Sequence, residues 1–193
     1  MENISKKLIV VGDGECGKTS LLIRYGMDKF YEGHVPTVFD SYVVDVQIGT
    51  EETLKLSLFD TAGQEEHDRL RTLSYPNTDV ILMCFSIASP KSLESVLTKW
   101  TPEMHHCCKK VPMILVGTKK DLRDDLRTTR RLAEQDQSPV SLDQARAVAK
   151  SIKAVDYIEC SSKDKRGIDE VMAKAIELSL KPRKSKKGFC SFL

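Results

Sequence analysis

Residues 12–19, with the sequence GDGECGKT, decide the fold of this 193-residue chain. They follow a short apolar run at residues 7–11 and precede a segment, 19–27, whose apolar residues recur at helical spacing. The pattern G-x-x-x-x-G-K-[ST] lets backbone N–H groups wrap phosphate oxygens where a helix begins. We therefore predict a strand, a phosphate-binding loop and a helix; a glycine-rich turn with a solvated lysine is the plainer alternative.

The rest of the chain alternates in the same way. Residues 43–48 and 54–59 alternate in hydropathy around a turn at 49–52, which predicts a hairpin. Continuous apolar strands and amphipathic helices follow in turn: strands at 80–85, 111–116 and 155–160, and helices at 90–106, 141–152 and 167–180. This order predicts an α/β fold, a mostly parallel six-stranded sheet with one antiparallel edge strand and helices on both faces. Ligands of such sheets bind beyond the carboxyl ends of the strands.

Length and composition indicate one globular domain, with 40% hydrophobic and 30% charged residues. The best apolar stretch, residues 80–85, is far shorter than the ~18–20 residues of a membrane span. Charge within residues 12–19 interrupts the N-terminal apolar run, so we expect no secretory signal. The six cysteines show no metal-ligand spacing and predict free cytosolic thiols, with Cys84 and Cys160 buried in strands.

The net charge of +2 is unevenly distributed. Five basic residues lie within seven positions near the C-terminus: Lys181, Arg183, Lys184, Lys186 and Lys187. The rest of the chain carries 25 basic against 28 acidic residues. A partner that recognises positive charge would therefore meet this tail and not the body, and we expect no binding to nucleic acid. We predict a domain at residues 1–180 and a disordered tail at 181–193.

The loop and the hairpin's second strand supply residues for phosphate and metal. Lys18 would reach the β- and γ-phosphates of a nucleotide, and the Thr19 hydroxyl would ligate Mg²⁺. Residues 60–64, DTAGQ, come at the end of that strand. There a carboxylate can hold Mg²⁺ through water, a glycine amide can bond the γ-phosphate and a glutamine can orient an attacking water. An ordinary Asp-Thr turn is the alternative.

The choice of base depends on residues 118–121, TKKD, after the strand at 111–116. The Asp121 carboxylate can accept hydrogen bonds from N1–H and the exocyclic amino group of guanine, donors that adenine lacks. Because a buried carboxylate without partners is costly, discrimination can be large. Four residues alone are a weak signal, and a charged surface turn would look the same. Their place in the order of elements, with residues 160–163 after the last strand, favours GTP over ATP.

Together these segments resemble the small GTPases of the Ras superfamily, a group of P-loop NTPases, and within it the Rho family, over about residues 6–193. Residues 35–40 are similar to the first switch of Rho proteins, and residues 68–71 and 73–76 to the second. The polar segment at about 123–139 resembles the helical insert of that family. The resemblance implies slow hydrolysis of GTP to GDP and phosphate, and a signalling switch that controls the actin cytoskeleton and cell shape or motility.

The resemblance also implies roles for single residues. Thr37 would bind Mg²⁺ and the γ-phosphate, Phe30 would pack edge-on to guanine, and Ser20 would bond the α-phosphate; a capping threonine and a core phenylalanine are the plainer alternatives. The stems of Lys119 and Lys163 would cover the base. The expected catalytic residues are Gln64, Lys18 and Thr37. The expected Mg²⁺ ligands are Thr19, Thr37 and, through water, Asp60. The expected nucleotide contacts are Gly14, Glu15, Cys16, Gly17, Lys18, Thr19, Ser20, Phe30, Thr37, Asp60, Gly63, Thr118, Lys119, Asp121, Ser161, Ser162 and Lys163.

Five positions depart from the family pattern, and one of them is Ser162, which replaces a common alanine but would act through its backbone amide. Glu15 replaces the usual alanine, His34 and His67 replace tyrosines, and Thr118 stands where many relatives have asparagine, although Rac-like members also have threonine. We hypothesise that Glu15 weakens nucleotide retention by placing negative charge near the phosphates. The alternative is a carboxylate that points into water and is screened. A second hypothesis is that His34 closes less well over the nucleotide and leaves the first switch more mobile.

Residues 190–193, CSFL, fit the C-a-a-X pattern, and the final leucine favours a geranylgeranyl group on Cys190. One lipid anchors a protein marginally, and the basic residues beside it supply the second signal. We expect attachment to an anionic membrane at the cytoplasmic face of the cell membrane, with a cytosolic pool. Without the lipid pattern, the basic run would equally fit a solvated or nuclear-targeting tail.

The predicted reaction proceeds by positioning and charge stabilisation, without a covalent nucleophile. No arginine in the motifs is placed to act in cis, so a GTPase-activating protein could supply one. Exchange factors, effectors at the switches and a dissociation inhibitor are further partners that the resemblance implies for an expected monomer. Two rivals remain: a nucleotide-loaded scaffold that hydrolyses little GTP, and a P-loop kinase acting on a small molecule.

Overall fold

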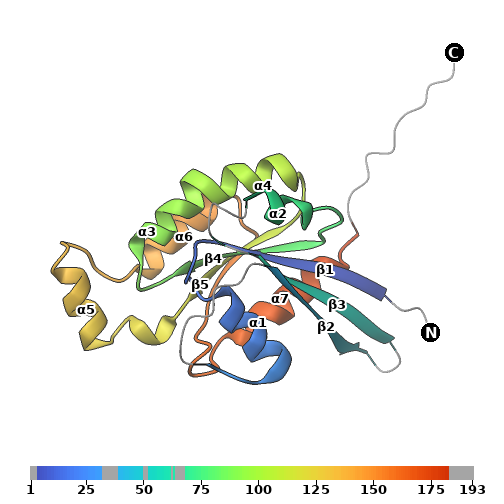
Figure 1. Ribbon diagram of the computed structural model, residues 1–193, viewed down its shortest axis with the longest axis horizontal. Helices are drawn as coiled ribbons and strands as arrows, with labels where there is room; N and C mark the ends of the chain where they lie inside the picture. Colours follow the sequence, from blue (N-terminus) through green and yellow to red (C-terminus); the bar gives the residue numbers. More distant parts are fainter. Residues whose placement is uncertain (1–3, 32–38, 50–51, 62, 64–67, 183–193) are drawn as a thin grey trace, which may run out of the picture.

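The computed structural model describes residues 4–31, 39–49, 52–61, 63 and 68–182 (Figure 1). The strands of this part form a six-stranded sheet in the order β2-β3-β1-β4-β5-β6. Within the sheet, β2 runs antiparallel to β3, and the other neighbouring strands pair in parallel. The predicted sheet and its antiparallel edge strand are thus confirmed. The strands are β1 Ile4–Val11, β2 Phe39–Ile48, β3 Glu52–Thr61, β4 Val80–Ser86, β5 Met113–Thr118 and β6 Asp156–Glu159.

Helices cover both faces of the sheet (Figure 1). One layer contains α1 Lys18–Met27 and α7 Ile168–Leu180, whose apolar residues join one core cluster. The other contains α3 Pro90–Ser95, α4 Thr101–Cys107 and α6 Leu142–Ser151, which join the second cluster. Helix α2, Asp68–Leu73, lies beside α4 in this second layer.

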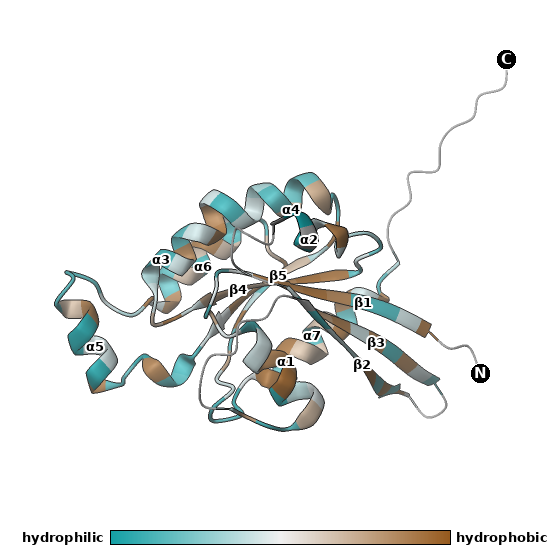
Figure 2. Ribbon diagram, viewed as in Figure 1, coloured by the Kyte–Doolittle hydropathy of each residue, from teal (hydrophilic) through white to brown (hydrophobic). Residues whose placement is uncertain are grey.

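Alternate side chains of each central strand enter opposite clusters. In β1, Leu8 and Val10 pack towards α1 and α7, whereas Ile9 and Val11 pack towards the other layer. Because successive side chains of a strand point to opposite faces, a strand covered on both sides must be apolar throughout. Figure 2 shows this as a hydrophobic sheet between helices with hydrophilic outer faces.

The helix expected at residues 90–106 consists of three consecutive parts. Pro90 begins α3, and the Ser89 side chain accepts a hydrogen bond from the backbone N–H of Ser92, as expected of a cap. A π-helical turn, η2 at Val96–Trp100, then separates α3 from α4. The turn was not predicted, because its five residues are too few to show a period of their own.

Other boundaries also differ from the prediction. Strand β5 begins at Met113 and not at residue 111, because Pro112 has no N–H for the ladder. The short helices α2 and η3, Lys120–Leu122, were not predicted as helices, since they are too short to show periodicity. Within residues 123–139 the structure contains α5, Leu126–Ala133. None of the helices in the described part of the chain is long and apolar enough to span a membrane.

Candidate functional site

The loop at residues 12–19 joins the end of β1 to the start of α1, at the carboxyl edge of the sheet. Gly12 and Gly17 have φ angles of 146° and 95°, a region that favours glycine. A Cβ atom on Gly12 would lie 2.2 Å from the carbonyl oxygen of Cys84 in β4, so no side chain fits there. The local geometry is therefore that of a tight loop whose backbone can approach a ligand closely.

Lys18 lies over this loop, although it belongs to the first turn of α1. Its side chain is 6% exposed, and its ammonium group donates hydrogen bonds to the carbonyl oxygens of Gly12 (2.9 Å) and Asp13 (2.7 Å). A buried positive charge at a helix N-terminus favours anions. This position matches the predicted role of Lys18 beside the phosphates.

The end of β3 lies directly against the loop. The Thr19 hydroxyl donates a 2.5 Å hydrogen bond to Oδ2 of Asp60, which is fully buried. A Cβ atom on Gly63 would lie 2.3 Å from the backbone nitrogen of Gly14, so the two backbones are in contact. The fold therefore brings together Thr19 and Asp60, two predicted Mg²⁺ ligands that are 41 positions apart in sequence.

The Thr19–Asp60 pair fits Mg²⁺ in its chemistry. Mg²⁺ takes oxygen ligands, keeps several waters, and is usually held by one or two protein groups together with phosphates. A hydroxyl and a buried carboxylate that touch each other beside a phosphate-binding loop provide such a donor set. Thr19 would hold the ion directly and Asp60 through water, where the ion would neutralise phosphate charge.

The residues predicted to bind the base come from two further strand ends. The Ser161 hydroxyl, after β6, donates a 2.7 Å hydrogen bond to Oδ1 of Asp121 in η3. The backbone N–H of Lys120 donates to the carbonyl oxygen of Cys160 at 3.0 Å, which joins the same two segments. The Asp121 carboxylate is thus fixed in direction and half-buried, as recognition of a base edge requires.

Thr118 connects the base-binding segment to the phosphate loop. Its hydroxyl contacts the carbonyl oxygens of Cys16 in the loop and of Phe85 in β4. A Cβ atom on Gly17 would also be 3.4 Å from the Thr118 hydroxyl. Threonine at this position, one of the departures from the family pattern, therefore has a defined structural role.

The remaining contact residues lie around the same edge. Ser162 and Lys163 follow β6, and their carbonyl oxygens accept hydrogen bonds from Arg24 of α1 at 2.7 and 3.1 Å. Arg24 was missed, because nothing in its sequence context distinguishes it from other exposed arginines of a helix. Ser20 and Phe30 are half-buried at the start of α1 and just after it.

Cys16 contributes to the loop through its backbone. Its side chain is buried, and burial raises the pKa of its thiol. Burial likewise raises the pKa of Cys160, to about 12. These thiols, with that of Cys84, remain neutral near pH 7 and pack as small apolar groups, as predicted for the two strand cysteines.

Asp13, a position of the loop to which the motif assigns no role, makes a long-range contact. Its Oδ1 accepts a 2.7 Å hydrogen bond from the indole N–H of Trp100 in η2. The predicted residues Thr37 and Gln64, and with them His34, His67 and Cys190, lie outside the described residues. Their assigned roles stay predictions.

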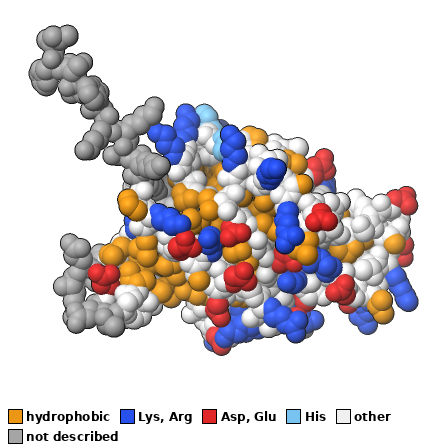
Figure 3. All heavy atoms as spheres, turned by 180° about the vertical axis from the view of Figure 1, so that it is seen from behind, with side chains coloured by type: hydrophobic (Ala, Val, Ile, Leu, Met, Phe, Trp, Pro, Cys, Tyr) orange, Lys and Arg blue, Asp and Glu red, His pale blue; other side chains and the backbone are white. Residues whose placement is uncertain are grey.

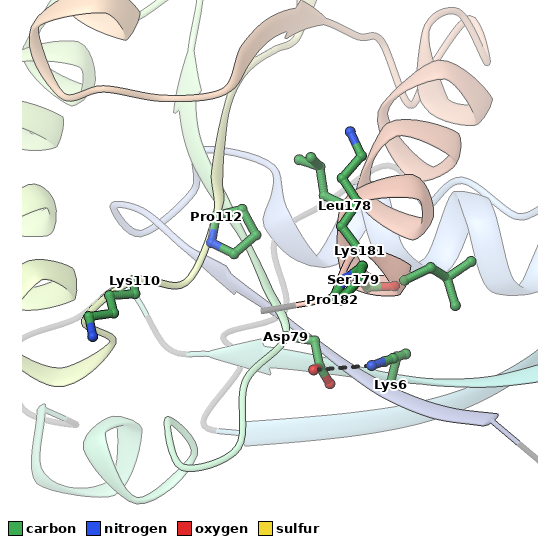
Figure 4. Close-up of a pocket in the computed structure, with 9 residues that line it drawn as sticks. Lys6, Asp79, Lys110, Pro112, Leu178, Ser179, Lys181 and Pro182 are labelled. Atoms are coloured by element: carbon green, nitrogen blue, oxygen red, sulfur yellow. Dashed lines mark ion pairs between the residues drawn. The ribbon is translucent and has the colours of Figure 1, made fainter. Parts of the chain in front are cut away.

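A hollow of about 400 Å³ lies at the other edge of the sheet, where β1, β4 and β5 begin and α7 ends. Figure 4 shows the ion pair of Lys6 with Asp79 on one wall and Lys110 on the loop before β5. Lys181 and Pro182, where the described chain ends, also line it. This hollow is basic and lies far from the motif residues, so it is no part of the nucleotide site.

Comparison with known protein families gives a match that covers nearly the whole chain. The model of the Ras family matches residues 7–181. That range contains the phosphate loop, the Thr19–Asp60 pair and the Asp121–Ser161 pair, which the fold brings to one edge of the sheet. The chain therefore belongs to the Ras family and is a small GTPase, a switch that binds GTP, GDP and Mg²⁺.

Proposed function

We propose that this chain is a Rho-type small GTPase that acts as a membrane-anchored switch on the actin cytoskeleton and on cell shape or motility. The observation that carries the Rho assignment is helix α5, Leu126–Ala133, within the segment 123–139 that resembles the Rho insert. Asp125 caps this helix by accepting a 2.8 Å hydrogen bond from the backbone N–H of Thr128. The segment thus contains a defined helix with its own cap, which supports its interpretation as the insert.

Helix α5 presents a surface to a partner. Leu132 is buried beneath it, whereas Leu126 is 70% exposed, and Arg127 and Arg130 are exposed as well. Arg123, at the start of the segment, joins Glu159 of β6 through two 2.6 Å hydrogen bonds and the carbonyl oxygen of Val140 at 3.1 Å. Both ends of the segment are therefore held to the domain, which supports α5 as a fixed recognition element.

Two arginines near the site already bind other protein groups, which is consistent with slow intrinsic hydrolysis of GTP. Arg24 is engaged with the carbonyl oxygens of Ser162 and Lys163, and Arg71 with the Glu103 carboxylate. Lys18 would stabilise phosphate charge, Gln64 would orient water and Thr37 would close the first switch. An arginine from a GTPase-activating protein would then add roughly 10³–10⁵-fold in rate.

The positive charge beside the start of the tail supports the proposal of membrane attachment. The hollow at the end of α7 is lined by Lys6, Lys110 and Lys181, with Asp79 paired to Lys6. Figure 3 shows Lys and Arg side chains beside the point where the undescribed tail begins. Geranylgeranylated Cys190 and the basic tail would hold this edge at an anionic membrane on the cytoplasmic face of the cell membrane, with a cytosolic pool kept by a dissociation inhibitor.

Single-turnover hydrolysis of bound GTP, with and without a Rho-type activating protein, tests the proposal. A Rho-type switch gives slow hydrolysis alone and a strong acceleration with the activator. Hydrolysis that an activator of another Ras-family branch accelerates, and the Rho activator does not, would contradict the Rho assignment. Loss of all hydrolysis despite tight GTP binding would favour the second candidate, a nucleotide-loaded scaffold. Exchange factors and effectors that recognise the two switches are the remaining proposed partners.

A further inference from the structure

Trp100 is the single tryptophan of the chain and is fully buried at the end of the π-helical turn η2. Its indole N–H, the one donor that the side chain has, bonds Oδ1 of Asp13 at 2.7 Å. A hydrogen bond to a carboxylate is stronger than a neutral one. The second helical layer thus holds the phosphate loop by a side chain, in addition to the backbone contacts of the sheet.

The face of the same indole ring contacts helix α2. The Arg71 guanidinium lies 4.7 Å from the centre of the Trp100 ring, a distance typical of a cation–π contact. Arg71 is also buried, and its Nε and Nη2 donate to the two Glu103 oxygens of α4 at 3.0 and 2.9 Å. The Tyr75 hydroxyl contacts both Arg71 and Glu103. Helix α2 is therefore joined to α4 and to Trp100 by one buried polar cluster.

The π-helical turn explains how one residue can serve both contacts. A π turn inserts one residue, so the side chains after it are rotated by about 100° relative to a regular helix. Trp100 is the last residue of this turn, and Glu103 of α4 follows three positions later, on the same side of the continuous helix. The turn thus directs the indole N–H at Asp13 while Glu103 reaches Arg71.

We propose that Trp100 is a positioning residue that couples the phosphate-binding loop to helix α2, so that displacement of α2 loosens the hold of the loop on its nucleotide. Helix α2 begins at Asp68, five residues after Gly63, whose backbone touches the loop directly. The loop and α2 are thereby connected twice: through the chain at Gly63 and through Trp100. The proposal rests on guanine nucleotide binding at this loop and adds a route by which a protein bound at α2 controls release.

Dissociation of fluorescent GDP from the full-length protein tests the coupling. Trp100→Phe keeps the aromatic ring and removes the N–H, and it should accelerate release about tenfold. Glu103→Gln perturbs the other end of the cluster and should accelerate release about threefold. In the double variant the effects should fall short of additivity, because both act on one connection. Leu97→Ala, a change to a 43% exposed residue of the same turn, is the matched control and should leave release unchanged.

Fluorescence of Trp100 supplies a readout that a purely packing role would not move. Exchange of GDP for a non-hydrolysable GTP analogue should change the emission of the wild-type protein, and Glu103→Gln should reduce that change. Unaltered release in Trp100→Phe, strictly additive effects in the double variant, or identical emission with both nucleotides would each overturn the coupling. If the protein bound no GDP, its assignment as a GTP-binding switch would be wrong, and the coupling would be wrong with it. Thermal melting of each variant separates loosened binding from unfolding.

Discussion

Thr118 shows how one side chain can join two binding segments. Its hydroxyl contacts the carbonyl oxygens of Cys16 and Phe85, so the loop for phosphate and the strand that leads to Asp121 are held at a fixed separation. The placement of Lys18, Thr19, Asp60 and Asp121 at one edge of the sheet could be predicted from sequence, because each belongs to a short motif at a strand end. The contacts of Thr118 could not, because they depend on how three strands lie side by side.

Replacement of Asp121 should abolish the preference for guanine. Asp121→Asn keeps the shape and can still meet the Ser161 hydroxyl, but it removes the charge and one acceptor, so we expect GDP to bind about 100-fold more weakly. Ser161→Ala, which removes the orienting hydrogen bond alone, should cost about fivefold. Competition between GDP and ADP for each variant measures the preference. A guanine preference that survived Asp121→Asn would exclude Asp121 as the base-reading group.

Glu15 permits a test of charge beside the phosphates. Glu15 is exposed and has a φ of 60°, and an alanine would need the same backbone, so Glu15→Ala changes the side chain at matched backbone strain. If its carboxylate repels the phosphates, Glu15→Ala and Glu15→Gln should both slow GDP release a few-fold, corresponding to about 1 kcal/mol. The difference should shrink at high salt. Equal release rates in all three proteins would support the screened alternative.

The sequence predicts those helices and strands that have a clear hydropathy pattern, and it does not predict the elements that lack one. Residues 8–11 of β1 and 80–85 of β4 are buried on both faces and are apolar throughout. The capping box of α6, formed by Ser141 and Gln144, marks the start of that helix. Turn η2 and helix α2 carry no such signal, because they are short and their geometry depends on tertiary contacts such as those of Trp100. The proposed coupling through Trp100 depends on these two unpredicted elements.

The clamp between Arg123 and Glu159 should make the domain sensitive to acid. Burial alone would raise the pKa of Glu159, but hydrogen bonds from Arg123 and Tyr157, with the positive charges of Arg123 and Lys120, lower it below its usual 4.5. A carboxyl whose pKa is lowered by folding stabilises the native state above pH 4.5, and this contribution is lost as the pH falls through the folded-state value.

Denaturant unfolding at pH 7, 5 and 4 measures this contribution. Arg123→Ala should lower the free energy of unfolding at neutral pH by about 2 kcal/mol, because it leaves a mostly buried carboxylate without its main partner. It should also flatten the loss of stability on acidification relative to wild type. Arg127→Ala, an exposed arginine of α5, is the control and should change neither. A pH profile of Arg123→Ala parallel to that of wild type would rule out the clamp as its source.

The nucleotide residues and the basic hollow lie at opposite edges of the sheet. The nucleotide residues follow the carboxyl ends of β1, β3, β5 and β6, whereas the hollow with Lys6, Lys110 and Lys181 lies where β1, β4 and β5 begin. This polarity follows from parallel strands, because all their carboxyl ends share one edge. The chain leaves the described domain at Pro182, beside the hollow, and so on the side away from the nucleotide. The proposed contacts with a membrane at this edge would therefore leave the nucleotide edge accessible.

Binding of the prenylated protein to vesicles tests this arrangement. Cys190→Ser removes the lipid, and because stable anchoring takes two signals, the protein should stay in solution. With Cys190 intact, Lys110→Glu and Lys181→Glu should each weaken binding to phosphatidylserine-containing vesicles about fivefold, since a basic residue near the surface contributes about 1 kcal/mol. Lys91→Glu, an exposed lysine near the start of α3 at the nucleotide edge, should have no effect. Equal losses from all three lysine variants would mean that overall charge, and not the edge beside the tail, sets the affinity. Binding that persisted in Cys190→Ser would refute the lipid anchor itself.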